Sequence, residues 1–311
     1  MAFSRGLSWC FMIGMTVALV SCQQQQNTGS TTRGSVKVEC DEALWPVMQI
    51  EADDFQRTYT DAHITMRSVE AREAIANFFN DSVRVIVTDR MLNKGERDAI
   101  AAAKVEFQEF KIALDGIAVI THKDNPVKDL RMGQLDSIFS GRMTKWPVTR
   151  KSIDVAIGNV NSSTNEVFGT LVLKGEKFTP EATAFSSSER LVEFVRNSEN
   201  AIGIVGLSWV RGLDKELTVI GLGDPSSRPD STEPLGKFYR PFQAYVYKGY
   251  YPLVRAAYMY TRELTNLTVG YGFIAHVTSA PGQQIFLNNG LVPTTMPVRI
   301  VNLTSQQVKP Q

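Results

Sequence analysis

Apolar and polar residues alternate after residue 35 in a rhythm of short strand-like runs and longer helix-like segments. Short β-branched or alternating runs predict strands at 36–38, 64–66, 83–87, 110–114, 117–120, 153–157, 183–185, 202–205 and 243–247. Apolar residues at helical spacing predict helices at 43–59, 69–80, 91–104, 132–139, 166–173, 188–197, 252–264 and 269–277. Strands that alternate with helices pair in parallel between two helical layers, so the predicted fold class is α/β.

The first 21 residues carry one charge, Arg5, and an apolar run over 9–20 that is too short for a comfortable transmembrane helix. This pattern predicts a secretory signal peptide over 1–21. The run ends in Leu-Val-Ser-Cys, which resembles a bacterial lipobox and makes Cys22 the expected site of lipidation. Residues 22–35 predict a polar tether that anchors an extracytoplasmic body to the membrane by lipid alone. An uncleaved anchor with an incidental cysteine is the alternative.

The composition is that of an ordinary globular protein. With 311 residues, 43% hydrophobic and 21% charged, the chain can form one large domain or two lobes. A net charge of +1 lacks the basic field that nucleic-acid binding needs, which disfavours that class of partner. Cys40 has no partner once Cys10 is removed and Cys22 is lipidated, so no internal disulfide is expected. Three well-separated histidines make a zinc site improbable, and no metal or cofactor is expected.

Polar residues gather where predicted strands end and helices begin, at 39–42, 67–68, 88–90 and 159–165. In open α/β sheets ligands bind beyond the carboxyl ends of strands, and helix N-termini suit anions. The candidate ligand-binding residues are Ser68, Thr88, Asp89, Asn161, Ser162, Ser163 and Thr164. Asp89 is a candidate acceptor that detects a proton on the ligand. The alternative is that these side chains only cap helices and form turns.

Two segments of the chain resemble a known family. Residues 113–126 (ALDGIAVITHKDNP) and 135–146 (LDSIFSGRMTKW) are similar to the "DGIAVIVNKDNP" and "IFTGKITNW" segments of the phosphate-binding periplasmic proteins of ABC transporters. Further matches are 201–209, 251–255 and 281–284. The resemblance runs in collinear order from about residue 36 to residue 294.

The resemblance implies a two-lobed type II periplasmic-binding-protein fold with two crossover connections. The first lobe is expected to comprise 36–115 plus 240–303, and the second lobe 116–239. Asp115-Gly116 would then lie at one of the crossovers, where glycine tolerates a bending connection.

The family's binding residues correspond here to Ser68, to Thr88-Asp89 and to two of the three positions Ser162, Ser163 and Thr164. The chain departs from the family pattern at two places. Asn159 or Gly158 stands where the family has an arginine, and the first loop, 39–42, is acidic instead of hydroxyl-rich. Arg67 and Arg90 are the candidates for the missing positive charge.

These observations favour a monomeric, lipid-anchored protein that binds phosphate or a related small oxyanion between its lobes and delivers it to the permease of an ABC importer. A binding module of the same fold that serves sensing or surface assembly is the second hypothesis, motivated by the two departures. An extracytoplasmic hydrolase is the third. It is disfavoured because the chain contains no Gly-x-Ser-x-Gly elbow and no cluster of metal-binding histidines, so no catalytic residues are proposed.

Overall fold

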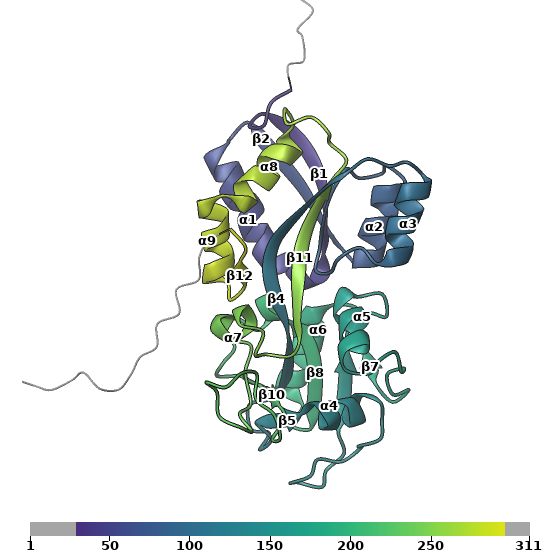
Figure 1. The fold of residues 1–311 in the computed structure, drawn as a ribbon, viewed down its shortest axis with the longest axis vertical. Coiled ribbons are helices and arrows are strands. Elements are labelled where there is room, and N and C mark those ends of the chain that lie inside the picture. The colour runs from purple at the N-terminus through teal and green to yellow at the C-terminus, as the bar shows by residue number, and fades with distance from the viewer. Residues whose placement is uncertain (1–28, 296–311) are drawn as a thin grey trace, which may run out of the picture.

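The computed structural model describes residues 29–295 as two α/β lobes joined by two long strands (Figure 1). The predicted signal peptide, Cys22 and the first half of the predicted tether lie outside the described residues. Within 29–295, no helix combines the length and the apolar character needed to cross a membrane.

The first lobe is a sheet with helices on both faces. Its elements are β1 (Gly34–Asp41), the 3-10 turn η1 (Glu42–Leu44), α1 (Trp45–Thr58), β2 (Ala62–Val69), α2 (Ala71–Phe79), β3 (Val85–Thr88), α3 (Lys94–Ala102), α8 (Val269–Thr278) and α9 (Ala280–Asn288). Strand β1 pairs in parallel with β2 and β3. Phe55 and Phe273 belong to the apolar core that α1, α8 and α9 cover, and Phe78 belongs to the core beneath α2 and α3.

The second lobe has its own core around Phe139, Trp146 and Phe168, all of which are fully buried. Its elements are β5 (Asp129–Arg131), α4 (Met132–Phe139), β6 (Asp154–Ile157), α5 (Ser163–Leu171), β7 (Thr183–Ala184), α6 (Ser188–Asn197), β8 (Ala201–Gly206), the 3-10 turn η2 (Leu207–Trp209), β9 (Leu217–Val219), β10 (Gly221–Gly223) and α7 (Gln243–Tyr247). Strand β6 pairs in parallel with β7 and β8.

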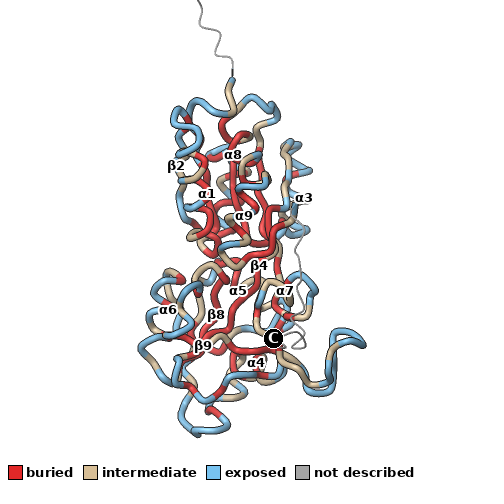
Figure 2. The backbone as a smooth tube through the Cα atoms, turned by 90° about the vertical axis from the view of Figure 1, so that its left-hand side faces the viewer, coloured by how far each residue is buried: buried red, intermediate tan, exposed pale blue. Residues whose placement is uncertain are grey.

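Two strands connect the lobes. The long strand β4 (Gln108–His122) pairs antiparallel with β11 (Val254–Thr261) in the first lobe and with β8 and β9 in the second. The short β12 (Val292–Pro293) also pairs with β4. The main sheet therefore runs continuously through both lobes in the order β2-β1-β3-β11-β4-β8-β6-β7. Most residues of β4 are buried where this strand passes between the lobes (Figure 2).

Four predicted elements differ from those in the structure. The two strands expected at 110–114 and 117–120 are one strand, β4, because Asp115 and Gly116 continue the ladder to β11. Glycine at position 116 eases close packing, since a Cβ would lie 3.2 Å from the Leu207 side chain, which would have to shift slightly.

The segments 243–247 and 252–264 were predicted with the opposite secondary structure. The first is the helix α7, which Gln243 fixes by donating hydrogen bonds to the Leu287 and Leu291 carbonyls, both at 2.7 Å. The second contains the strand β11, which lies between β3 and β4 and is buried on both faces. A strand buried on both faces shows no alternation of polar and apolar residues, so its pattern cannot be told from that of a buried helix.

The boundary between the lobes also differs from the expected residue 240. Val246, Tyr251 and Leu253 pack into the core of the second lobe, whereas Ala257 and Met259 pack into that of the first. The chain therefore returns from the second lobe to the first lobe at β11. The strand pairing is mixed, because β4 and β11 run antiparallel to their neighbours, whereas the strand–helix rhythm predicted parallel pairing.

Candidate functional site

A buried arginine lies where β4 and β11 pass between the lobes. The Arg255 side chain of β11 is 2% exposed, and its Nε and Nη2 donate to Oδ2 of Asp115 in β4 at 3.1 and 2.9 Å. Its Nη2 also forms an ion pair with Asp89, the first residue after β3. Gly206 leaves room for this group, because a Cβ there would lie 2.9 Å from Arg255 Nη2.

The start of α5 in the second lobe faces the same guanidinium. Arg255 Nη1 donates to the Ser163 hydroxyl at 3.3 Å and to the Thr164 hydroxyl at 3.0 Å. Ser162 is the N-cap of this helix, and its hydroxyl accepts from the backbone N–H of Asn165 at 3.2 Å. The hydroxyls and the guanidinium therefore meet at a helix N-terminus, where partial positive charge favours an anion.

Burial shapes the electrostatics of this group, which we call the Arg255 cluster (Asp89, Asp115, Ser163, Thr164 and Arg255). Burial raises the pKa of the Asp89 carboxyl well above its usual range. The Asp115 and Asp41 carboxylates act in the same direction, and the positive charge of Arg255 opposes the shift. Burial disfavours the Arg255 cation, but the facing Asp89 and Asp115 carboxylates raise its pKa, so it stays charged. The cluster thus holds one fixed cation beside a carboxyl whose ionised form that cation stabilises.

The acids of the first loop are each paired inside the protein. Glu39 forms an ion pair with Arg67 at 2.6 Å, and it also accepts from the Asn77 amide. Asp41 is fully buried and accepts from the backbone N–H groups of Ala43 and Asp89. Glu42 accepts from Ser188 of the second lobe. These pairs lower the electrostatic cost of an acidic loop beside an anion site.

The structure brings only some of the predicted ligand-binding residues together. Asp89, Ser163 and Thr164 surround Arg255, and Ser162 caps the helix beside them. Thr88 is buried, but its hydroxyl donates to the Arg90 carbonyl.

Within the part of the chain that the structure describes, the remaining candidates form no hydrogen bond or ion pair with the Arg255 cluster. Ser68 is exposed near the end of β2, and Asn161 is exposed in the loop before α5. The two arginines expected to supply positive charge are paired with acids elsewhere. Arg67 pairs with Glu39 and Glu73, and Arg90 with Glu96 and Glu166.

The sequence reasoning missed Arg255. The residue stands in the family-like segment 251–255, but that segment was read as the start of a helix. The signal that could have found it is a lone arginine in an otherwise apolar strand, which must find a carboxylate when it is buried.

Among residues 29–295, no group of three His, Cys, Asp or Glu side chains is arranged to hold a metal ion.

Comparison with known proteins supports the family resemblance. The sequence profile of the PBP superfamily domain matches residues 25–281. "Phosphate-binding protein PstS" of Staphylococcus epidermidis is 23% identical over 283 residues, which cover 88% of this chain and 84% of that protein. Its namesake from Staphylococcus saprophyticus is 25% identical, over 81% of this chain and 77% of that protein.

A solved structure shows the same relationship. A candidate phosphate ABC transporter substrate-binding protein from Clostridium perfringens, crystallised with bound phosphate, superposes with a TM-score of 0.71 at 27% identity. The match covers 84% of this chain and 100% of the other. Together with the two lobes, the connecting strands and the profile match over most of its length, this likeness shows that the chain belongs to the PBP superfamily.

Proposed function

We propose that this protein binds phosphate, or a closely related protonated oxyanion, between its two lobes and presents it to an ABC permease. The observation that carries the proposal is the meeting of the buried Arg255 guanidinium with the N-terminus of α5. The curated relatives are named phosphate-binding proteins, and the C. perfringens structure contains phosphate.

Ser163 and Thr164 have the chemistry of anion ligands. Each hydroxyl accepts a hydrogen bond from Arg255, so each keeps its own hydrogen to donate to an oxyanion. The partial positive charge at the start of α5 adds to the charge of the guanidinium. Because these groups are buried, their attraction for an anion is screened less by water and salt than it would be at an exposed site.

Asp89 would select for a proton on the ligand. When it is ionised, its carboxylate accepts a hydrogen bond from a protonated oxyanion such as hydrogen phosphate and repels one that has no proton, such as sulfate. Oδ2 of Asp89 is paired with Arg255, whereas Oδ1 has neither a hydrogen bond nor an ion pair within the described residues, so Oδ1 is the oxygen available as an acceptor. The cluster thus fits a tetrahedral anion that carries at least one proton.

The cellular setting follows from the same proposal. The lobes would close on the anion, and the closed shape would be recognised by the permease of an ABC importer. Lipid attached to Cys22 would keep the monomeric body outside the cytoplasm and close to that permease. No catalytic step is part of this function.

The test is titration calorimetry on protein stripped of bound ligand. We expect heat on adding phosphate or arsenate and none on adding sulfate at the same concentration. Binding of sulfate as tightly as phosphate would contradict the role given to Asp89. If none of the three anions binds, the assignment of the site to oxyanions is wrong.

One alternative is favoured by Arg67 and Arg90, which pair with acids and so do not supply the missing positive charge. In that case the same fold would serve sensing or surface assembly, with another ligand. Measuring the uptake of labelled phosphate by cells that lack this protein distinguishes import from sensing or surface assembly. Reduced uptake, restored by the wild-type gene, supports import, and unchanged uptake supports the alternative.

A further inference from the structure

A carboxylate of the first lobe caps a helix of the second. Glu42 of η1 accepts the backbone N–H of Ser188 at 2.8 Å and the Ser188 hydroxyl at 2.7 Å. Ser188 is the first residue of α6, where unpaired N–H groups carry partial positive charge. The Glu42 carboxylate is therefore a well-matched partner for this end of the helix, although it comes from the opposite lobe.

A carboxylate of the second lobe likewise contacts the first lobe. Oε2 of Glu166, in the first turn of α5, lies 3.3 Å from Nε of Arg72 and 3.2 Å from Nε of Arg90. Both arginines belong to the first lobe. Arg90 is only 6% exposed, so water and salt screen its attraction to Glu166 weakly.

Hydrogen bonds to main-chain carbonyls of η1 reinforce the contact between Glu42 and the second lobe. The indole Nε1 of Trp209 in η2 donates to the Glu42 carbonyl at 3.0 Å, and the Ser208 hydroxyl donates to the Ala43 carbonyl at 2.9 Å. The turn η1 is thus held to the second lobe by its backbone as well as by the Glu42 side chain.

We propose that Glu42 and Glu166 are interlobe latches. They hold the lobes together with groups of the chain itself and set how readily the protein opens. A contact that forms only when the lobes meet stabilises the closed form relative to the open one. An anion held at the Arg255 cluster would leave only when these contacts break, so the latches would also govern its rate of release.

The inference rests on the two-lobed fold and not on the identity of the ligand. A hydrogen bond to a charged group typically contributes enough to change an equilibrium by roughly ten-fold or more. Removing the Glu42 carboxylate should therefore lower the ratio of closed to open molecules by at least about ten-fold.

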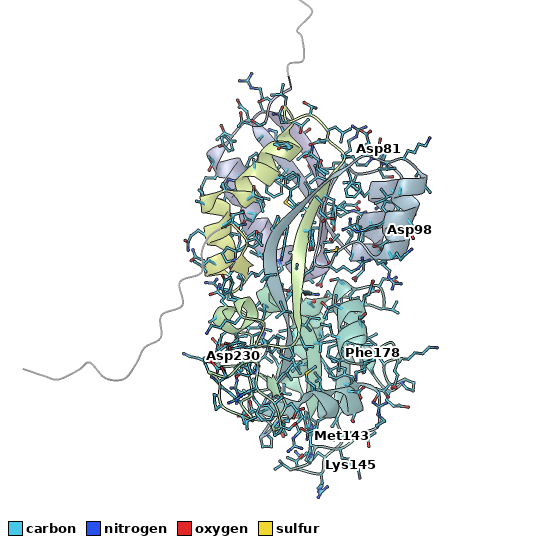
Figure 3. All side chains as sticks on the ribbon, viewed as in Figure 1. Asp81, Asp98, Met143, Lys145, Phe178 and Asp230 are labelled. Carbon is cyan, nitrogen blue, oxygen red and sulfur yellow. The ribbon has the colours of Figure 1, made fainter. Side chains whose placement is uncertain are left out.

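The experiment measures the distance between the lobes in the full chain without added ligand. Asp98 on α3 and Lys145 near the far end of the second lobe are both exposed and far apart (Figure 3). Replacing both with p-acetylphenylalanine allows spin labelling that leaves the native cysteines untouched. Pulsed electron resonance then gives the populations of short and long distances.

The wild-type chain should show mainly the short distance, and Glu42→Ala should shift population to the long one. Ser188→Ala removes one of the two donors and should give a smaller shift in the same direction. Glu166→Gln keeps the shape of its side chain and should also open the protein. The matched control is Glu189→Gln, an exposed acid one residue along α6, which should leave the distances unchanged.

A mainly open wild-type chain, or unchanged distances in Glu42→Ala, Ser188→Ala and Glu166→Gln, would overturn the latch. If Glu42→Ala does not fold, the other two variants still decide the matter. Stopped-flow release of inorganic phosphate should be several-fold faster in the latch variants. Failure of phosphate to bind any variant would refute the proposed ligand, while the distance populations would still judge the latch.

Discussion

Replacing Arg255 with methionine would remove the only positive charge in the Arg255 cluster and keep an apolar side chain of similar length. Asp89 and Asp115, which are 0% and 1% exposed, would remain buried without their cation. Breaking a buried ion pair by removing one partner typically costs ~3–5 kcal/mol, because the other charge stays desolvated. For a chain of this size each kcal/mol lowers the melting temperature by about 2–4 °C, so Arg255→Met should lose roughly 6–20 °C.

The loss should depend on pH, and its sign follows from linkage. Without Arg255 the pKa of the Asp89 carboxyl in the folded state rises further above its unfolded value of about 3.9. A carboxyl whose pKa is raised on folding gives more stability at low pH and less as the pH rises through its folded-state pKa. The deficit of Arg255→Met relative to wild type should therefore be large near about pH 8 and shrink towards about pH 5.

Differential scanning calorimetry at both pH values measures this deficit. Adding Asp89→Asn and Asp115→Asn to Arg255→Met removes the stranded charges, so the triple variant should recover part of the lost melting temperature at the higher pH. Arg255→Lys keeps a charge but loses the forked geometry, and it should fall between wild type and Arg255→Met. An unchanged melting temperature in Arg255→Met, or a deficit equal at both pH values, would refute the reasoning.

Three further substitutions test other parts of the structure. Thr164→Val removes a hydroxyl at constant size. The binding free energy of phosphate, measured by calorimetry, should weaken by ~1–2 kcal/mol with little change in melting temperature. A large loss of stability at unchanged affinity would indicate that Thr164 only caps the helix. Gly206→Ala places a Cβ 2.9 Å from Arg255 Nη2 and should lower the melting temperature, and an unchanged value would show that Arg255 can shift freely. Burial raises the pKa of Glu51 to about 9, so the stability of the wild-type protein should decline as the pH rises from about 4.5 towards 9. Glu51→Gln should make this decline shallower in thermal melts, and an identical pH profile in both proteins would contradict the prediction.

Local sequence was enough for most helices, because capping and periodicity act within a few residues. The helix predicted at 188–197 is found with the same bounds as α6, where Ser187 is the N-cap and accepts from the Arg190 N–H. A capping box between Asn93 and Glu96 similarly defines the start of α3. In both cases the side chains that begin the helix lie within one turn of it.

The part of the candidate site at the start of α5 could also be predicted from the sequence. A run of serine, threonine and asparagine between a strand and a helix predicts a polar helix N-terminus. Ser163 and Thr164 lie at that N-terminus and contact the same Arg255 side chain as Asp89. Ser68 and Asn161 carry the same local pattern but are exposed. The residue types alone could not separate the two groups, because burial depends on how the lobes meet.

The sequence by itself determined the α/β class, most of the elements and the polar helix start, since each depends on neighbours along the chain. Only the tertiary structure decided which charges pair. The antiparallel register of β11 and β4 sets Arg255 directly opposite Asp115, 140 residues earlier in the chain. Contact between the lobes then adds Ser163 and Thr164. Buried charges must find partners because water is excluded, but which partners they find depends on distances that exist only in the folded chain.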